Sequence, residues 1–398
     1  MTEQKKINIG LFIDVFYPMV DGVVVVVDQY AKLLSEIANV YVFAPKSRDR
    51  TYQDQKTYPI YRSKQIKIPF TDYDLSLPFI DLKFKNALKH SKLDIVHIHS
   101  PFTLGQTGIK YAKKHNIPVI ATLHSQYQMD FMERTHSKVL ADLAIKEIMH
   151  VFNQCDELWA VNQRVAEIYT TYGAEKTPKV QHNATDMVLF NNLSELEKLK
   201  MSYKIKPEEK VFLYVGRLDA VKNLEFMIDA LYKLRLQGYK FKIIFVGSGP
   251  FEEEMRKQIK KRGLTSYVIF TGKIMDRIQL SMHYRIADLF LFPSLYDSSS
   301  LVQIEASSQK TPTLFLYGAA TSSTVTENVN GYFSEPDPDA YATKIIDIFK
   351  NTRLYSKVKE QCYKDLYKTW NQVTEEAYKN YVRVIEEKKG KQSLPQSL

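Results

Sequence analysis

The chain has 398 residues, of which 44 % are apolar and 25 % charged, and this suits two globular domains of ordinary size rather than one. Its net charge is +10, and its only cysteines, Cys155 and Cys362, exclude a disulfide framework and a cysteine-rich zinc site. There is no run of about 20 apolar residues and no signal-peptide pattern after MTEQKK, so we expect a cytoplasmic protein without a membrane-spanning helix.

Basic residues recur in three segments, 83–92, 110–115 and 256–262. They form either solvated helix faces or a surface that attracts anions. No nucleic-acid motif with interleaved aromatic residues accompanies them. Of the anionic partners, a membrane surface is therefore expected and nucleic acid is not.

In the first half of the chain, short apolar runs alternate with segments of helical periodicity, such as 28–37 and 104–115. The predicted strands are 7–13, 40–45, 94–100, 118–124 and 157–162. Alternation of this kind, with strands that are apolar throughout, predicts a parallel sheet covered by helices on both faces.

A polar interval follows at 191–210, and then the pattern restarts. The second set of predicted strands is 211–216, 242–247, 267–272, 287–293 and 311–318. The fold class is therefore α/β, with two Rossmann-like, doubly wound domains that face each other across a cleft. We expect domains at 1–190 and 191–364, then C-terminal helices at 365–398 that end in a flexible tail.

Ligands of such sheets bind at the carboxyl ends of the strands, so residues at those positions are the candidates for a site. In the first half, Asp21-Gly22 marks a tight turn before a helix, which is either a plain connection or a point of close ligand approach. His97 and His99 alternate onto one strand face and suit a core or hydrogen-bonding role better than a metal site. His124 ends the next strand and could face the cleft.

In the second half, VGRLDAVKN places Arg217 and Lys222 between a strand and a helix, where two cations suit a diphosphate. The pair Gly247-x-Gly249 lacks the third glycine of a dinucleotide fingerprint and favours a tight strand–helix turn.

The stretch SLYDSSSLVQIEASSQ (294–309) carries two acids, Asp297 in a loop and Glu305 in a helix that starts after a Ser300-x-x-Gln303 capping box. Carboxylates suit hydroxyl groups, whereas the backbone N–H groups at a helix start suit anionic oxygens. A sugar hydroxyl, a phosphate and a ribose hydroxyl together describe a nucleotide sugar.

These motifs resemble those of the retaining glycosyltransferases of family 4, which have the GT-B fold and include bacterial lipid- and polysaccharide-directed enzymes. The resemblance covers roughly residues 7 to 335 and includes, in order, DGV, DIVHIHSPF, CDELWAVNQ, VQHNATDMVLF, VGRLDAVKN, GSGP and ENVNGYF. It also implies that the C-terminal helices at 365–398 cross back to the first domain.

The resemblance implies roles for four groups of residues. Arg217 and Lys222 would neutralise the leaving diphosphate, and the backbone at Gly22 would approach the donor phosphates. Asp297 would contact the donor sugar and Glu305 the ribose.

The remaining implied contacts are to the sugar, the β-phosphate and the base. The backbone around Ser299, Ser300 and Leu301 would hold the sugar and β-phosphate, and His124 would lie next to the transferred sugar. Base contacts would come from Gly272 and Lys273.

Three positions depart from the family pattern. Asp297 replaces the usual Glu, Ser298–Ser300 replace a glycine-containing segment, and Ala184 replaces a hinge glycine. These changes affect the identity of the donor sugar more than the phosphate clamp.

The implied reaction is transfer of a hexose or N-acetylhexosamine, with retention, from a nucleotide sugar that is expected to be UDP-linked. No cofactor or metal is expected, and the leaving phosphate oxygen would take the acceptor's proton. The acceptor is a lipid, saccharide or protein, such as diacylglycerol, a lipid-linked saccharide or a cell-envelope polymer, at the inner face of the cell membrane. The alternatives are an enzyme that makes a sugar phosphate or epimerises a nucleotide sugar, and a catalytically degenerate partner subunit.

Overall fold

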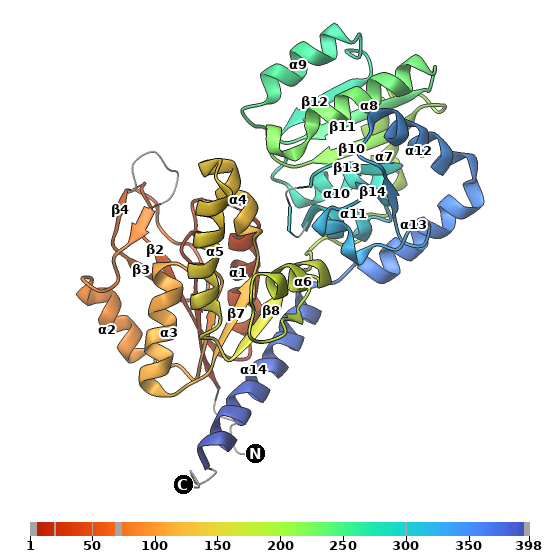
Figure 1. The fold of residues 1–398 in the computed structure, drawn as a ribbon. Coiled ribbons are helices and arrows are strands. Elements are labelled where there is room, and N and C mark those ends of the chain that lie inside the picture. The colour runs from red at the N-terminus through yellow and green to blue at the C-terminus, as the bar shows by residue number, and fades with distance from the viewer. Residues whose placement is uncertain are drawn as a thin grey trace. The chain divides into compact units, whose positions relative to one another are not determined.

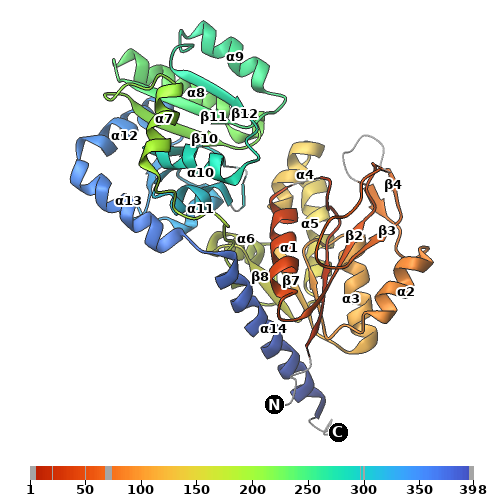
Figure 2. The same ribbon diagram turned by 180° about the vertical axis from the view of Figure 1, so that it is seen from behind.

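The structure is a computed structural model that describes residues 6–19, 21–49, 51–67, 74–295, 297–298 and 301–393. The chain divides into two compact units, Met1–Asn183 with Trp370–Leu398, and Ala184–Thr369. Figures 1 and 2 show each unit as a sheet with helices on both faces, which confirms the predicted fold class.

The first unit is built on a seven-stranded sheet in the order β3-β2-β1-β6-β7-β8-β9, in which all neighbours are parallel. Its strands are β1 (Asn8–Phe12), β2 (Asn39–Pro45), β3 (Ile60–Ser63), β6 (Ile95–Ile98), β7 (Val119–Leu123), β8 (Glu157–Ala160) and β9 (Lys179–Val180). Strands β4 (Gln65–Lys67) and β5 (Asp74–Ser76) form a separate antiparallel pair. The helices are α1 (Gly22–Leu34), α2 (Leu82–His90), α3 (Thr103–His115), α4 (Tyr127–Thr135), α5 (Lys138–Phe152), α6 (Gln163–Thr171) and α14 (Trp370–Ser393).

The second unit contains a six-stranded parallel sheet in the order β12-β11-β10-β13-β14-β15. Its strands are β10 (Lys210–Val215), β11 (Phe241–Val246), β12 (Val268–Gly272), β13 (Leu289–Phe292), β14 (Thr313–Leu316) and β15 (Tyr332–Ser334). The helices are α7 (Leu193–Ser202), α8 (Leu224–Leu236), α9 (Glu252–Lys261), α10 (Arg277–Ile286), α11 (Leu301–Ser308), α12 (Pro338–Lys350) and α13 (Thr352–Leu366), with 3₁₀ turns at Ala220–Lys222 and Ala320–Thr324.

Burial on both faces explains why the inner strands are apolar throughout. In β10, Phe212 and Tyr214 enter one buried cluster together with α8 and α12. The alternate residues Val211 and Leu213 enter a second cluster, which includes residues of α10. A strand residue of either parity is therefore removed from water, and the period-2 polar alternation of a half-exposed sheet is absent.

All ten predicted strands form. The strands that were not predicted in the two main sheets, β3, β9 and β15, are short edge strands with sequences IYRS, KV and YFS. Such strands have only one neighbour and little apolar sequence, so the pattern that predicts inner strands does not detect them.

The predicted segment boundaries at 190 and 365 differ from the edges of the compact units. The second unit already begins at Ala184, and the backbone N–H of Thr185 bonds to the carbonyl of Lys368 within the same unit. Helix α13 belongs to the second unit, and the chain rejoins the first unit only at Trp370. Helix α14 then packs on α1 and ends at Ser393.

Candidate active site

The second unit brings cations and an acid together at its topological switch point, where β10 and β13 are neighbours and their connections diverge. Lys222 follows β10 and Asp297 follows β13, and Lys222 Nζ lies 2.6 Å from Asp297 Oδ1. Both side chains are about four-fifths buried, at 18 % and 21 % exposed. Two predicted site residues that are 75 positions apart are thus in direct contact.

Arg217 lies in the same loop as Lys222 but has a different environment. Its Nη2 is 2.9 Å from Asp219 Oδ2, and the side chain is 68 % exposed. The carbonyl of Arg217 accepts a hydrogen bond from Tyr214 Oη at 3.1 Å, so the backbone is fixed while the guanidinium lies at the surface. This cation can therefore reach a ligand without breaking a buried contact.

Gly247 and Gly249 support this loop. A Cβ at Gly247 would lie 1.9 Å from the carbonyl oxygen of Gly216, and one at Gly249 would lie 2.1 Å from that of Leu218. The two loops are also joined by backbone hydrogen bonds from Leu218 N to the Ser248 carbonyl and from Phe251 N to the Leu218 carbonyl. The glycine pair therefore has the predicted role of a tight strand–helix turn, and it holds the segment that carries Arg217.

Glu305 lies in α11 and is 8 % exposed. Arg277 Nη1 is 2.9 Å from Glu305 Oε1, and Tyr284 Oη donates to Glu305 Oε2 at 2.9 Å. Burial raises the pKa of Glu305, and the Arg277 guanidinium opposes that shift. Arg277 also forms an ion pair with Asp186, so it links α11 to the segment where the second unit begins.

The other predicted donor contacts are placed as follows. Gly272, at φ 72°, ends β12, and Lys273 is exposed just after it. Leu301 is the first residue of α11. Ser299 and Ser300 lie outside the described residues, so only Gln303 of the predicted capping box is described. The side-chain amide of Gln303 donates to Thr324 Oγ1 at 3.1 Å.

The first unit places three neutral imidazoles at the corresponding edge of its sheet. His97 is fully buried and hydrogen-bonded to Tyr381 Oη (2.6 Å) and Thr122 Oγ1 (2.7 Å). His99 Nδ1 lies 3.0 Å from His124 Nε2. Burial lowers the pKa of His124 to about 3 and holds the pKa of His97 and His99 well below the usual value, with the neighbouring imidazoles contributing.

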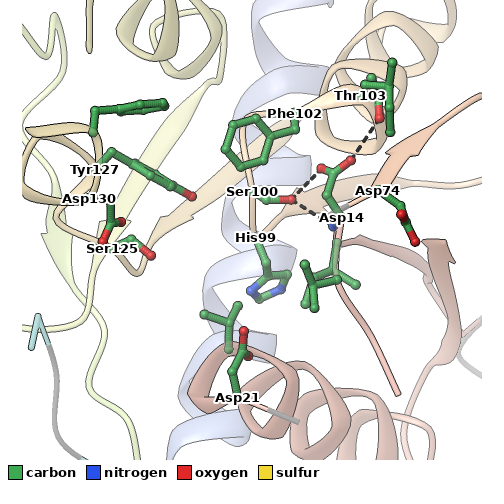
Figure 3. A pocket seen from close by; sticks show the side chains of 15 residues that line it. Asp14, Asp21, Asp74, His99, Ser100, Phe102, Thr103, Ser125, Tyr127 and Asp130 are labelled. Atoms are coloured by element: carbon green, nitrogen blue, oxygen red, sulfur yellow. Dashed lines mark hydrogen bonds between the residues drawn. The ribbon is translucent and has the colours of Figure 1, made fainter. Parts of the chain in front are cut away.

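A cavity of about 290 Å³ lies in the first unit, lined by the segments that follow β1, β6 and β7, together with β5, α1 and α4 (Figure 3). His99, rather than the predicted His124, lines this cavity. Gly22, which opens α1, is exposed, and the N-cap before it, Asp21, accepts from Val24 N at 2.8 Å. Asp14 caps α3 from the loop after β1, accepting from Leu104 N at 2.8 Å.

Sequence reasoning missed Arg277, Tyr284 and Asp14. Asp14 follows the first strand directly, so the strand-end rule that selected Asp21 could have found it. Arg277 and Tyr284 lie within α10, a helix that the strand-end rule does not cover. Only the packing of α10 against α11 brings them to Glu305.

Two doubly wound units, each built on a parallel sheet, are the architecture of the GT-B fold. Residues 20–188 match the family model described as Glycosyltransferase Family 4, and residues 196–365 match the one described as Glycosyl transferases group 1. The chain therefore belongs to the family 4 type of glycosyltransferases and is an enzyme.

Curated relatives match most of the chain. The chain is 24 % identical to the alpha-monoglucosyldiacylglycerol synthase of Acholeplasma laidlawii, over 82 % of this chain and 84 % of that protein. It is 25 % identical to the synthase of the same name from Streptococcus pneumoniae, over 83 % and 76 %. Identity to a GDP-mannose-dependent alpha-mannosyltransferase of Corynebacterium glutamicum is 25 %, over 96 % and 90 %.

Solved structures show the same fold. Anabaena HepE in complex with UDP superposes with a TM-score of 0.77 at 18 % identity, over 95 % of this chain and all of that one. The sucrose-phosphate synthase of Thermosynechococcus elongatus also gives 0.77, at 20 % identity, over 96 % of this chain and all of that one.

Proposed function

We propose that the enzyme transfers a hexose or N-acetylhexosamine from a UDP-linked sugar to a hydroxyl group of a lipid acceptor, with retention of the anomeric configuration. The observation that carries this proposal is the contact between Lys222 and Asp297 at the switch point, with Arg217 exposed in the same loop. Cations there suit a diphosphate, and a carboxylate beside them suits a sugar hydroxyl.

In the proposed reaction, the acceptor oxygen forms a bond to the anomeric carbon as the bond from that carbon to the diphosphate breaks. Arg217 and Lys222 stabilise the negative charge that develops on the leaving diphosphate. The acceptor's proton passes to the leaving phosphate oxygen, so no side chain is assigned as a base. Asp297 orients the sugar, and Glu305, held by Arg277 and Tyr284, receives the ribose hydroxyls.

The two relatives named alpha-monoglucosyldiacylglycerol synthase favour glucose as the sugar and diacylglycerol as the acceptor. A lipid-linked saccharide or a cell-envelope polymer is the broader alternative. The mannosyltransferase that depends on GDP-mannose shows that the nucleotide base varies among the relatives, so the base must be measured rather than assumed.

An exposed apolar surface on α4 and α5 supports action at a membrane. Val139, Leu140 and Leu143 are 69 %, 53 % and 54 % exposed. Leu143 lies four positions after Val139 and three after Leu140, so it shares one side of α5 with both. Figures 1 and 2 show α4 beside α5, and α4 adds exposed Met132. Lys138 lies next to this surface and suits anionic lipid. No helix among the described residues is long and apolar enough to cross a bilayer.

Calorimetric binding of UDP, GDP and ADP, each alone and as the glucose conjugate, tests the donor site. We expect UDP-glucose to bind and Arg217→Ala to weaken that binding at least tenfold. Arg164→Ala is the matched control, because Arg164 is also an exposed arginine that forms an ion pair with an acid, Glu167. Radiolabelled transfer to diacylglycerol in nonionic micelles then tests the reaction.

Each result has a separate meaning. Nucleotide binding without transfer to any acceptor would favour the degenerate partner subunit. Conversion of the donor without an acceptor would favour the epimerase or sugar-phosphate reaction. Absence of nucleotide binding would remove the basis of the proposal.

A further inference from the structure

A group of basic side chains lies at the edge of the second unit's sheet where the parallel strands begin. Lys210 is the first residue of β10, and Asp288 directly precedes β13. Lys222, in the proposed donor site, lies beyond the other end of β10. The basic group and the proposed donor site are therefore at opposite edges of the same sheet.

Helices α10 and α13 bring two more cations to this edge. Arg285 lies in the last turn of α10, three positions before Asp288. Tyr355, in α13, donates from Oη to the carbonyl of Asp288 at 2.7 Å. Lys359 lies one turn further along α13, with Nζ 5.5 Å from the centroid of the Tyr355 ring. Arg285 and Lys359 therefore both lie next to the segment that leads into β13.

The acids of this region already have lysine partners. Asp288 Oδ1 lies 3.8 Å from Lys210 Nζ. Glu360 accepts from Lys310 Nζ with both carboxylate oxygens, at 2.6 and 2.9 Å. Two acids therefore face four cations, and each acid is closest to a lysine of its own.

The other two cations, Arg285 and Lys359, form no ion pair with an acid among the residues that the structure describes. Arg285 Nη1 reaches the carbonyl of Gln309 at 3.4 Å, and its Nε is buried without a hydrogen-bond partner there. Burial lowers the pKa of Lys359; Asp288 opposes this shift, whereas Arg285 and Lys210 add to it. Positive charges that are partly buried and repel each other are costly unless an anion accompanies them.

We propose that Arg285 and Lys359 form a binding site for a small phosphate dianion. A phosphate monoester carries close to two negative charges and three strong acceptor oxygens, which match two cations without acid partners. A guanidinium binds two phosphate oxygens through its planar fork, and an ammonium supplies a compact charge beside it. The site does not depend on sugar transfer, so the inference and the proposed function can fail separately.

Calorimetric binding of methyl phosphate to the full chain tests the site, with dimethyl phosphate as the matched probe. The two compounds share the phosphate group, but the diester carries a single negative charge, as does the phosphodiester of a lipid headgroup. We expect methyl phosphate to bind at least tenfold more tightly than dimethyl phosphate. Equal or tighter binding of the diester would overturn the assignment of a dianion and point to a lipid headgroup instead.

The variant Lys359→Met links the binding to this site. We expect it to weaken methyl phosphate binding at least tenfold with the fold retained, because methionine is also unbranched and packs well against the Tyr355 ring. Arg285→Gln should weaken binding as well. Lys357→Met is the matched control, because Lys357 is an exposed lysine of the same helix, two positions before Lys359, and its removal changes the net charge equally.

Lys222→Ala distinguishes this site from the proposed donor site, and we expect it to retain the methyl phosphate binding that Lys359→Met loses. Binding that is lost in Lys222→Ala and unchanged in Lys359→Met would place the anion at the donor site and overturn the inference. Absence of methyl phosphate binding would also overturn it. Equal weakening in Lys357→Met and Lys359→Met would overturn it too, because net charge rather than a site would then explain the binding.

Discussion

The two units have the same kind of parallel sheet, yet their switch points carry opposite chemistry. In the second unit the segment after β10 presents Arg217 and Lys222. Asn223, the N-cap residue of α8, donates its side-chain amide to the carbonyl of Pro293 and does not cap the helix through its side chain. In the first unit the segments after β1 carry Asp14 and Asp21, and both cap helices.

In the proposed function, the topology determines where a ligand binds, and the residues after each strand determine which ligand it is. A cationic edge favours a diphosphate, and an edge with capped helices and neutral imidazoles favours hydroxyl groups. The comparison can be tested from both sides.

The largest effect on sugar transfer is expected from removing Lys222, the buried one of the two cations after β10. Lys222→Ala should lower the rate of sugar transfer roughly 100- to 1,000-fold, because a group that stabilises the leaving diphosphate is lost. Single-turnover transfer from UDP-glucose measures this rate. Lys257→Ala, which removes an exposed lysine paired with Glu253, should leave it unchanged.

Asp297→Ala extends this test to the partner of Lys222. It should lower turnover far more than it lowers the free energy of unfolding, because Asp297 is expected to orient the sugar. Normal turnover in Asp297→Ala would contradict that role.

The next effect concerns the loop that carries Arg217. Gly249→Ala should destabilise the second unit by about 2 kcal/mol or more, because its Cβ would meet the backbone carbonyl of Leu218 at 2.1 Å. Gly238→Ala is the control: at φ 70° with nothing within 4 Å, it should cost only about 1 kcal/mol. Urea unfolding followed by circular dichroism measures both, and equal costs would show that the loop adapts.

Much of the fold could be predicted from the sequence, because inner strands of a two-sided parallel sheet are continuous apolar runs. The positions of Arg217, Lys222 and Asp297 at the switch point follow from the same rule, since parallel strands end at one edge of the sheet. Strand-end reasoning stops where a side chain from the interior of a helix enters the site. Arg277 reaches Glu305 only because α10 packs on α11, and no spacing along the chain specifies that packing.

The polar contacts in the first unit could not be predicted for a related reason. His99 and His124 are both strand-end residues, but a contact between them depends on the register of β6 and β7. Likewise, Asp14 caps a helix that starts 89 positions later. Apolar patterning predicts that a sheet forms, whereas such long-range polar contacts require the register itself.

Arg277 also affects the ionisation of Glu305, the buried acid of the second unit. The pKa of Glu305 is raised by burial, and Arg277→Gln should raise it further. When the pKa of a carboxyl is higher in the folded than in the unfolded protein, the free energy of unfolding falls as the pH rises through the folded pKa. The variant should therefore lose about 2 kcal/mol of unfolding free energy near neutral pH and clearly less near pH 5. The loss at neutral pH is smaller than for a fully buried ion pair, because the side chain of Arg277 is 42 % exposed.

Denaturant unfolding at both pH values measures this difference. Arg277→Lys, which keeps a positive charge, should recover part of the loss at neutral pH. A loss of equal size at both pH values would show that packing, rather than the charge on Glu305, explains the effect.

In the first unit, where three imidazoles are neutral, the expected effect on stability appears only on acidification. Burial lowers the pKa of His97, His99 and His124 in the folded protein. In the unfolded chain the pKa of each is about 6.5. Below that pH the unfolded chain binds more protons, so stability present at neutral pH is lost on acidification, at up to about 1.4 kcal/mol per pH unit for each imidazole.

Tryptophan fluorescence isolates this effect, because both tryptophans, Trp159 and Trp370, are buried in the first unit. The urea midpoint followed in this way should fall between pH 7 and pH 5, and His124→Gln should reduce the pH dependence by about a third. His283→Gln, which removes a buried histidine of the second unit whose pKa is also lowered, should leave the tryptophan-detected slope unchanged. If His124→Gln left the slope unchanged, His124 would not be a neutral buried group, and the contrast between the two sheet edges would rest on the carboxylate caps alone.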